Sequence, residues 1–177
     1  MKGSIIAAVR TERELATALD TAVETVFYLT PSVFSLAPSV EKAHARDKKI
    51  FIHMDLAEGI GKDRAGLQLV KNMHTDGIIS TRGSIIKMAR EMGLATVQRF
   101  FLVDSHSVAT IAETVKAVKP DKIEIMPGVV PKVIAHLKKE TEVPLIAGGL
   151  IDSQEEIERA LAAGAAAVSI GKKEFWR

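Results

Sequence analysis

The sequence lacks cysteine and long hydrophobic runs, and each absence removes a class of protein. Without cysteine among its 177 residues, the chain has no disulfide framework, no thiolate zinc site, no iron–sulfur cluster and no cysteine nucleophile. The apolar run near the N-terminus covers only residues 5–9, which is too short for a signal peptide or a membrane span. We therefore expect a cytoplasmic protein with no membrane partner.

Aromatic residues and excess charge are also scarce. Aromatic residues make up 5% of the chain, and Phe100 and Phe101 lie in an expected strand, so we assign them mostly to the core. The sequence offers no argument for a stacking platform for single-stranded RNA. The formal net charge is +2, which does not by itself indicate a nucleic-acid-binding protein. The hydrophobic fraction of 47% is enough for one globular core. We expect a single domain over residues 1–177.

Short aliphatic runs alternate with longer segments whose apolar residues are three and four apart, a pattern typical of strand–helix units. The expected strands start roughly 23 residues apart, close to the smallest βαβ repeat, and cover residues 5–9, 26–29, 50–54, 78–80, 97–102, 123–126, 145–147 and 167–170. Eight such units favour a compact (β/α)₈ TIM-barrel-like α/β domain over an open doubly wound sheet.

The expected helices have ordinary start and stop signals. Thr11 precedes the first helix, Ser153 and Glu156 form a capping box for the last, and Gly164 ends that helix. The chain is shorter than the roughly 200 residues that such barrels rarely fall below, so one helix is expected to be reduced. Because Pro38 interrupts the pattern after the second strand, we place the weakest helix there, over residues 39–46.

Functional groups of a parallel barrel lie at the carboxyl ends of its strands. The loops after the seventh and eighth strands are rich in glycine, and their freed backbone amides are typical of a barrel phosphate site. The expected phosphate-binding residues are Gly148, Gly149, Leu150, Gly171 and Lys172. The alternative is a purely structural role, in which these glycines serve only tight turns.

Polar side chains at the other strand ends are candidate ligand contacts. His53 and Asp55 alternate with aliphatic residues, so both are expected on one face of a strand. For His53, an internal hydrogen bond is the preferred interpretation. Asp55 is the better candidate, because a buried carboxylate needs a partner such as a ligand hydroxyl.

Charged residues inside the fifth and sixth strands allow two interpretations. Glu124 lies between two isoleucines and is expected to face the barrel interior. With Asp55 and Arg99 it forms either a charge network around a ligand or a structural ion pair with Arg99. Gln98 is a further ligand candidate, and Gly128 is either near the ligand or a turn residue.

The fourth strand ends in a hydroxyl-rich segment. Ser80 is a candidate ligand contact or, like Thr81, a helix N-cap. Arg82 has no role in capping the helix, and its guanidinium suits a phosphate. The alternative is that Arg82 is a solvent-exposed surface residue without a ligand. No metal-ligand cluster and no convincing catalytic set is found, so no metal and no catalytic residue are predicted.

Five blocks between residues 53 and 151 carry a family resemblance. The segments HMDLAEGIGKDRAG, GIISTR, QRFFLVDS, IEIMPGVVPKVI and IAGGLI, in this order, resemble the glycerol-3-phosphate-responsive antiterminator family. The resemblance implies a (β/α)₈-like barrel that binds glycerol 3-phosphate and then an mRNA leader with its terminator region. The residues that match family motifs are His53, Asp55, Gly59, Ser80, Thr81, Arg82, Gln98, Arg99, Glu124, Pro127, Gly128, Gly148 and Gly149.

The eighth strand departs from the family pattern. Where the family has Ser/Thr-Thr-Ser ahead of Leu-Trp, this chain has Ser169, Ile170 and Gly171, followed by Phe175 and Trp176. Two hydroxyl groups are missing, which bears on affinity or specificity for glycerol 3-phosphate. The backbone amide of Gly171 is still available to a phosphate.

Three functions remain open at this point. The first is a regulator of glycerol uptake and metabolism that has glycerol 3-phosphate as its effector, needs no other cofactor and binds RNA. The second is an enzyme on a phosphorylated three-carbon or sugar substrate, with Asp55 or Glu124 as general base. The third is a phosphate-binding barrel that has lost both activities. The sequence leaves open whether a homodimer is the active form.

Overall fold

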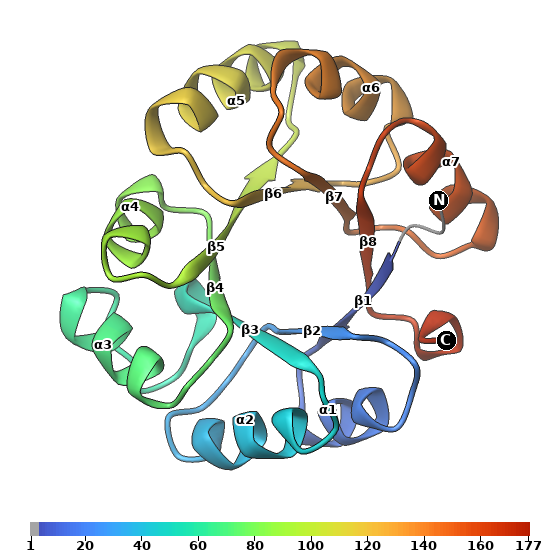
Figure 1. Cartoon of the computed structure of the whole chain (residues 1–177). Helices are drawn as coiled ribbons and strands as arrows, with labels where there is room; N and C mark the ends of the chain where they lie inside the picture. The colour runs from blue at the N-terminus through green and yellow to red at the C-terminus, as the bar shows by residue number, and fades with distance from the viewer. Residues whose placement is uncertain (1–3) are drawn as a thin grey trace.

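The computed structural model describes residues 4–177 and shows a closed barrel of parallel strands that pair in chain order, with the last strand beside the first (Figure 1). The strands are β1 Ser4–Val9, β2 Thr25–Tyr28, β3 Lys49–His53, β4 Gly77–Ser80, β5 Ala95–Phe101, β6 Lys122–Met126, β7 Leu145–Gly148 and β8 Ala167–Ile170. The predicted (β/α)₈ fold is confirmed, and the expected strand bounds agree to within two residues.

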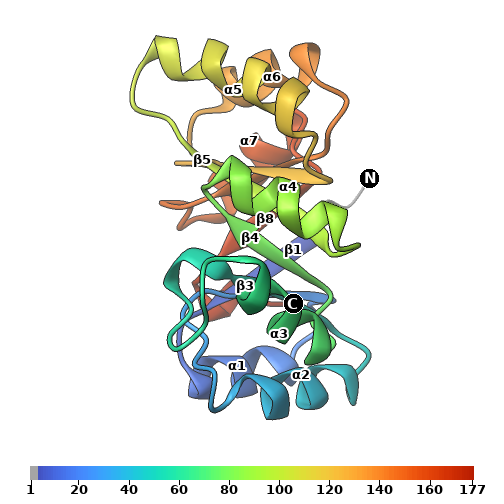
Figure 2. The ribbon, with the colours of Figure 1, turned by 90° about the vertical axis from the view of Figure 1, so that its left-hand side faces the viewer.

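A ring of helices surrounds the barrel, as the views in Figure 1 and Figure 2 show. Within the described residues they are α1 Glu12–Leu19, α2 Leu36–His44, α3 Arg64–Asn72, α4 Gly83–Glu91, α5 Ser105–Val118, α6 Pro131–Glu140 and α7 Gln154–Ala162. Two short 3₁₀ helices follow β3 and β8, η1 Met54–Leu56 and η2 Lys173–Phe175. No helix in this part of the chain is long and apolar enough to cross a membrane.

The reduced helix follows the eighth strand and not the second, so the prediction of its place was wrong. After β8 the chain forms only η2. The helix after β2 is of ordinary length and begins at Leu36. Pro38 therefore lies in its first turn, where the backbone N–H has no partner inside the helix and proline is tolerated.

Two hydrophobic layers follow from the alternation of side chains along each strand. One set of residues, including Phe27, Phe51, Ile79 and Val97, fills the barrel. The other set points outward and packs against the helices in the larger core. Because successive inward positions are two residues apart, the next inward residue after Phe51 is His53, and the next after Val97 is Arg99. The barrel thus becomes polar towards the carboxyl ends of its strands.

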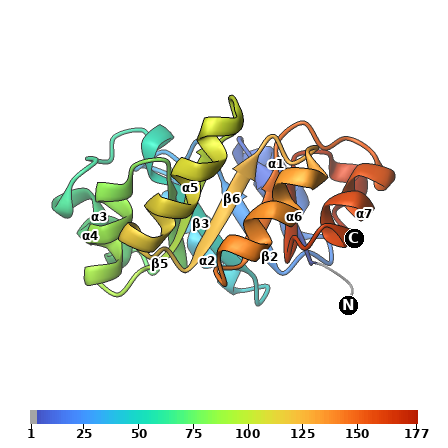
Figure 3. The same cartoon turned by 90° about the horizontal axis from the view of Figure 1, so that it is seen from above.

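The carboxyl ends of the strands lie at one edge of the molecule. Figure 3 shows the arrowhead of β6 and the first turns of α5 together at that edge. The connections there are short after β1, where α1 begins at Glu12, and longer after β3, where η1 and a loop precede α3. The candidate site is built on this uneven rim.

Candidate functional site

A buried ion pair closes the barrel interior near the carboxyl ends of β5 and β6. Arg99 and Glu124 are direct neighbours in the parallel ladder, and Arg99 Nε donates to Glu124 Oε2 at 2.6 Å. The side chains are 8% and 1% exposed. One of the two interpretations left open by the sequence, an internal pair, is therefore present, while the remaining N–H groups of the guanidinium leave donors for a ligand.

Gly148 makes room for this pair. A Cβ atom on Gly148 would clash with Oε1 of Glu124 and lie 3.1 Å from its Cδ. The carboxylate is held by Arg99 and cannot easily move away. A side chain at position 148 would thus displace the carboxylate, which explains glycine at the end of β7 in terms of packing, beside any role of its amide.

His53 lies in the same interior layer without a hydrogen-bond partner. It is 3% exposed, and neither ring nitrogen has a partner among the described residues. Its Nε2 atom is 4.0 Å from Asp55 Oδ2, beyond hydrogen-bond distance. Burial, followed by the positive charge of Arg99, lowers the pKa of His53 to about 4. His53 is therefore a neutral imidazole that offers one donor and one acceptor.

Asp55 binds its own chain. Its carboxylate accepts from Ser80 Oγ at 2.7 Å, from Thr81 N at 2.7 Å and from Thr81 Oγ1 at 2.8 Å. Burial raises the pKa of Asp55, but these hydrogen bonds outweigh it and hold the pKa below its usual value. The carboxylate links the loop after β3 to the end of β4, so the hydroxyl partners expected from a ligand are supplied by Ser80 and Thr81.

Positive charge exceeds negative charge around this mouth. The positive charges of Arg99, Lys62 and Arg10 lower the pKa of His53, and the negative charge of Asp55 raises it. Arg82 Nε is 3.9 Å from Asp55 Oδ1. The carboxylates beside these four cations are Asp55 and Glu124 in the mouth and Glu14 on the rim, where Glu14 Oε2 accepts from the backbone N–H of Arg10 at 2.7 Å. Burial and Arg82 lower the pKa of Lys62, while Asp55 raises it. A mouth with four cations against three carboxylates has a small excess of positive charge, which suits an anion. We call the four residues the cation cluster: Arg10, Lys62, Arg82 and Arg99.

Gln98 and Gly128 stand apart from this interior layer. Gln98 precedes the inward Arg99 and so points outward, where its Nε2 lies near the start of α4 at Gly83. Its Oε1 has no partner among the described residues. Gly128 packs on the neighbouring loop, because its N–H donates to Gly148 O at 2.6 Å and a Cβ there would be 2.8 Å from Gly148 N. The structure thus favours the turn interpretation of Gly128.

The seventh and eighth loops lie side by side at the rim. Gly149 and Leu150 both have positive φ values, 73° and 59°, and the side chain of Leu150 is exposed. Gly171 has open space where a Cβ would be, with Ala8 O the nearest atom at 3.7 Å. Lys172 does not point freely into the mouth, because its Nζ donates to Asp152 O at 2.8 Å. Lys172 therefore connects the two loops.

Two residues of this region, Ser169 and Lys62, were not predicted as site residues from the sequence. Ser169 is 4% exposed and lies two positions after Ala167, which faces the barrel interior. The alternation that placed Glu124 could have placed Ser169 as well. Lys62 donates to the carbonyl oxygens of Ala57 and Ile60, and only the folded path of the loop after β3 brings its charge near Asp55. Among the described residues, no acidic, histidine or cysteine cluster fit for a metal ion is present.

Comparisons with known proteins give relatives that match nearly the whole chain. A curated relative, the uncharacterized protein YgcP of Escherichia coli (strain K12), is 36% identical over 173 residues, which is 97% of this chain and 91% of the relative. A crystal structure of the glycerol uptake operon antiterminator regulatory protein of Listeria monocytogenes str. 4b F2365 is 32% identical. It superimposes with a TM-score of 0.92 over 99% of this chain and 96% of that one.

A crystal structure of a glycerol uptake operon antiterminator-related protein of Thermotoga maritima MSB8 is 29% identical, with a TM-score of 0.88 and 99% of each chain covered. Deoxyribose phosphate aldolase of Aeropyrum pernix is only 14% identical, with a TM-score of 0.73 over 96% of this chain and 86% of that one. This last likeness shows the fold alone and does not favour the enzyme interpretation.

The profile of the family described as "Glycerol-3-phosphate responsive antiterminator" matches residues 5–176, nearly the whole chain. The five sequence blocks lie within this match. The family is a regulatory one, and the sequence-based identification is confirmed. The chain belongs to the glycerol-3-phosphate responsive antiterminator family.

Proposed function

We propose that the chain binds glycerol 3-phosphate in the mouth of the barrel and, in response, acts on an mRNA leader so that transcription of glycerol uptake genes continues past a terminator. The observation that carries the proposal is the cation cluster around His53, whose ring nitrogens have no partner among the described residues. An anion with hydroxyl groups satisfies both features. The names of the Listeria and Thermotoga proteins support the same role.

The roles of single residues follow from their positions. The free N–H groups of Arg99, with the backbone amides of Gly149 and Gly171, are the proposed phosphate donors. His53 is the proposed partner of a glycerol hydroxyl, because a neutral imidazole both donates and accepts. Ser169 offers a further hydroxyl at the end of β8, where the chain lacks two that are typical of the family. Asp55 positions the loop between β3 and α3 and contacts no ligand directly.

The first test is calorimetric titration with glycerol 3-phosphate, with glycerol and inorganic phosphate as controls. We expect micromolar affinity that requires both halves of the ligand, since the phosphate and the hydroxyl groups have separate partners. Replacing Arg10 with alanine removes one charge of the cation cluster but none of the proposed hydrogen bonds to the phosphate, so we expect it to weaken binding about threefold, the worth of one nearby charge in water. Arg13→Ala is the matched control, because Arg13 is an exposed arginine of α1 outside the cluster.

The second test is retention of the operon's leader transcript at low salt, with and without glycerol 3-phosphate. Binding to several phosphates weakens steeply as salt rises, so retention that falls with salt indicates contact with the RNA backbone. Failure to bind glycerol 3-phosphate in calorimetry, together with no RNA retention, would refute the proposal.

A further inference from the structure

Two apolar side chains lie at the mouth of the barrel, one step above the buried ion pair. Phe101 and Met126 are direct neighbours in the ladder between β5 and β6. Each follows, by two positions, one member of the ion pair, Arg99 or Glu124, and side chains two positions apart point to the same face of a sheet. Because Arg99 and Glu124 face the barrel interior, Phe101 and Met126 face its mouth. We call these two residues the apolar pair.

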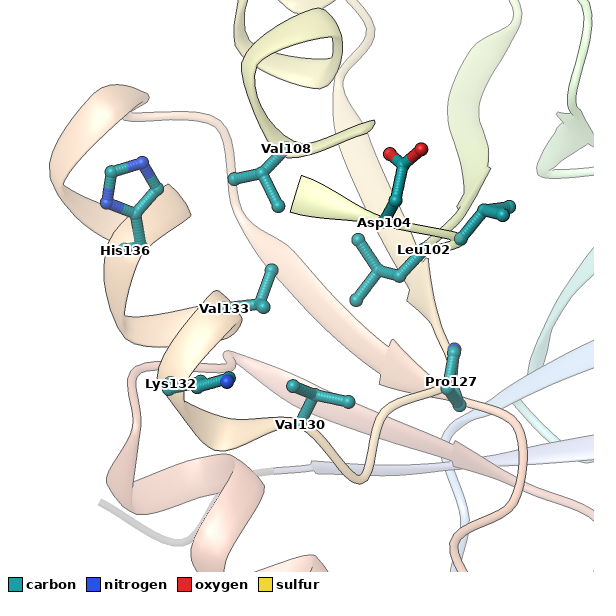
Figure 4. Close-up of a pocket in the computed structure, with 9 residues that line it drawn as sticks. Leu102, Asp104, Val108, Pro127, Val130, Lys132, Val133 and His136 are labelled. Carbon is teal, nitrogen blue, oxygen red and sulfur yellow. The ribbon is translucent and has the colours of Figure 1, made fainter. Parts of the chain in front are cut away.

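The neighbours of the apolar pair in the chain point the other way. Phe100 packs against the outer core, as expected from the sequence. Leu102 and Pro127 line a groove between α5 and α6, outside the barrel (Figure 4). The N–H of Leu102 donates to Met126 O at 2.7 Å, which holds the ends of β5 and β6 together. Residues that point outward therefore flank Phe101 on both sides, as the alternation along β5 requires.

Phe101 is open to solvent, whereas Met126 lies against the loop after β7. Phe101 is 56% exposed, so its assignment to the core was wrong. A Cβ atom on Gly149 would lie 2.6 Å from Met126 Cε, so the tip of Met126 covers Gly149. The backbone amide of Gly149 is one of the proposed phosphate donors. The apolar pair therefore extends from the open mouth to the edge of the proposed phosphate position.

The ring of Phe101 lies above the polar layer that holds Arg99 and His53. A strand rises about 3.3 Å per residue, so Phe101 is roughly 7 Å farther along β5 than Arg99. A ligand that joins Arg99 to His53 across the barrel therefore lies beneath the ring. A phenyl ring offers a phosphate no strong hydrogen bond, but covering carbon atoms with it removes apolar surface from water. The exposed ring thus matches the carbon atoms of a ligand and not its charge.

We propose that the apolar pair covers the carbon atoms of the effector, so that Phe101 makes the mouth select phosphate monoesters of small alcohols over inorganic phosphate. The inference rests on the proposed function, because it concerns the same ligand and names the residue that contacts its carbon chain. Inorganic phosphate meets Arg99 and the backbone amides but leaves the ring of Phe101 in water. A phosphate ester meets the same donors and also removes apolar surface of Phe101 from water.

Competition calorimetry on the full chain measures this selectivity with three ligands: glycerol 3-phosphate, ethyl phosphate and inorganic phosphate. Ethyl phosphate has carbon atoms but lacks the hydroxyl groups of glycerol, so it separates the role of Phe101 from that of His53. At about pH 8 ethyl phosphate and inorganic phosphate are both mainly dianions, so their charges match. We expect ethyl phosphate to bind about tenfold more tightly than inorganic phosphate, the usual effect of a small alkyl group on an apolar surface of a site.

Variants of Phe101 test whether the ring causes this difference. Phe101→Ser is expected to lower the ratio of the two affinities from about ten to about one, while Phe101→Leu, which keeps an apolar side chain, retains most of it. Two matched controls replace other exposed apolar residues. Val103 is 85% exposed and lines the groove outside the barrel. Phe34 is 92% exposed and lies in the loop before α2, across the barrel from β5 (Figure 1). Val103→Ser and Phe34→Ser are both expected to keep the unmodified ratio.

A fluorescent reporter tests directly whether a ligand covers position 101. Phe101→Trp places an indole there, while the native Trp176 is 2% exposed and contributes a constant emission. We expect glycerol 3-phosphate and ethyl phosphate to shift the emission of Phe101→Trp to shorter wavelength, because both cover the indole with carbon atoms. Inorganic phosphate is expected to leave the emission unchanged, and an equal shift with all three ligands would contradict the inference.

The outcomes separate the two proposals. If glycerol 3-phosphate binds, but Phe101→Ser leaves the ratio of the affinities for ethyl phosphate and inorganic phosphate unchanged, the ring does not contact the ligand. The inference is then overturned, while the proposed function stands. If ethyl phosphate binds more tightly than inorganic phosphate and glycerol 3-phosphate does not bind, the inference stands and the proposed function fails. If none of the three ligands binds, both fail.

Discussion

Replacing Arg99 with methionine tests whether the buried ion pair is a matched unit. The change leaves the Glu124 carboxylate, which is 1% exposed, without its partner at 2.6 Å. Removing one member of such a pair costs about 3–5 kcal/mol, whereas replacing both members with apolar residues of similar size is close to neutral. We therefore expect Arg99→Met to destabilise the fold strongly and Arg99→Met/Glu124→Leu to recover most of the loss.

Urea unfolding followed by circular dichroism measures the effect. With a slope of about 2 kcal/mol per molar urea, a loss of about 4 kcal/mol lowers the midpoint by about 2 M. The two variants are both expected to lose glycerol 3-phosphate binding in calorimetry, because both lack the guanidinium. A midpoint that moves by less than about 0.5 M in Arg99→Met, or a double variant no more stable than the single one, would show that solvent already compensates Glu124 and would refute the reasoning.

Three further predictions concern the same interior and the C-terminus. Gly148→Ala pushes a methyl group into the Glu124 carboxylate and is expected to cost about 1–3 kcal/mol in urea unfolding; an unchanged midpoint would mean that the carboxylate moves freely. Because the pKa of His53 is about 4 in the folded chain and 6.5 ordinarily, the unfolded chain binds the extra proton, so stability falls between pH 6.5 and 4. His53 accounts for about 3 kcal/mol of this loss in the free energy of unfolding. We expect this contribution to be absent in His53→Asn when urea midpoints at pH 7 and pH 4 are compared. An equal loss in both proteins would contradict the prediction. Trp176→Phe removes the hydrogen bond from Trp176 Nε1 to Ile170 O and is expected to lower the free energy of unfolding by about 1 kcal/mol. A thermal melt measures this loss, and an unchanged melting temperature would contradict the prediction.

The barrel could be predicted from the sequence because its strands are short aliphatic runs with regular spacing. Local signals also placed the cap of the last helix, where Ser153 and Glu156 form the expected capping box. The reduced helix was misplaced because Pro38 was taken to interrupt a helix, whereas it lies in the first turn of α2, which begins at Leu36. Whether a proline lies in the first turn or the interior depends on where the helix starts, and that start at Leu36 has no side-chain cap to reveal it.

The site was predictable as a region and less so residue by residue. Alternation along β6 correctly directed Glu124 inward, and the same rule sends Gln98 outward when Arg99 faces in. The partners of Asp55 could not be predicted, since they depend on how the loop after β3 folds against the end of β4. Lys172 likewise binds the backbone of Asp152, a contact set by the spacing of two loops and not by any motif.

If the proposed effector binds at the cation cluster, the stability of this protein becomes a measure of effector concentration. Like charges gathered at one mouth repel one another, so a bound dianion would reduce that repulsion. A ligand that binds only the folded chain stabilises it by about 2.7 kcal/mol at one hundred times its dissociation constant. In a cell, where unfolded chains are removed by proteases, such a protein persists longer when its effector is plentiful. The abundance of the protein would then follow the concentration of its proposed effector, without any change in the rate of protein synthesis.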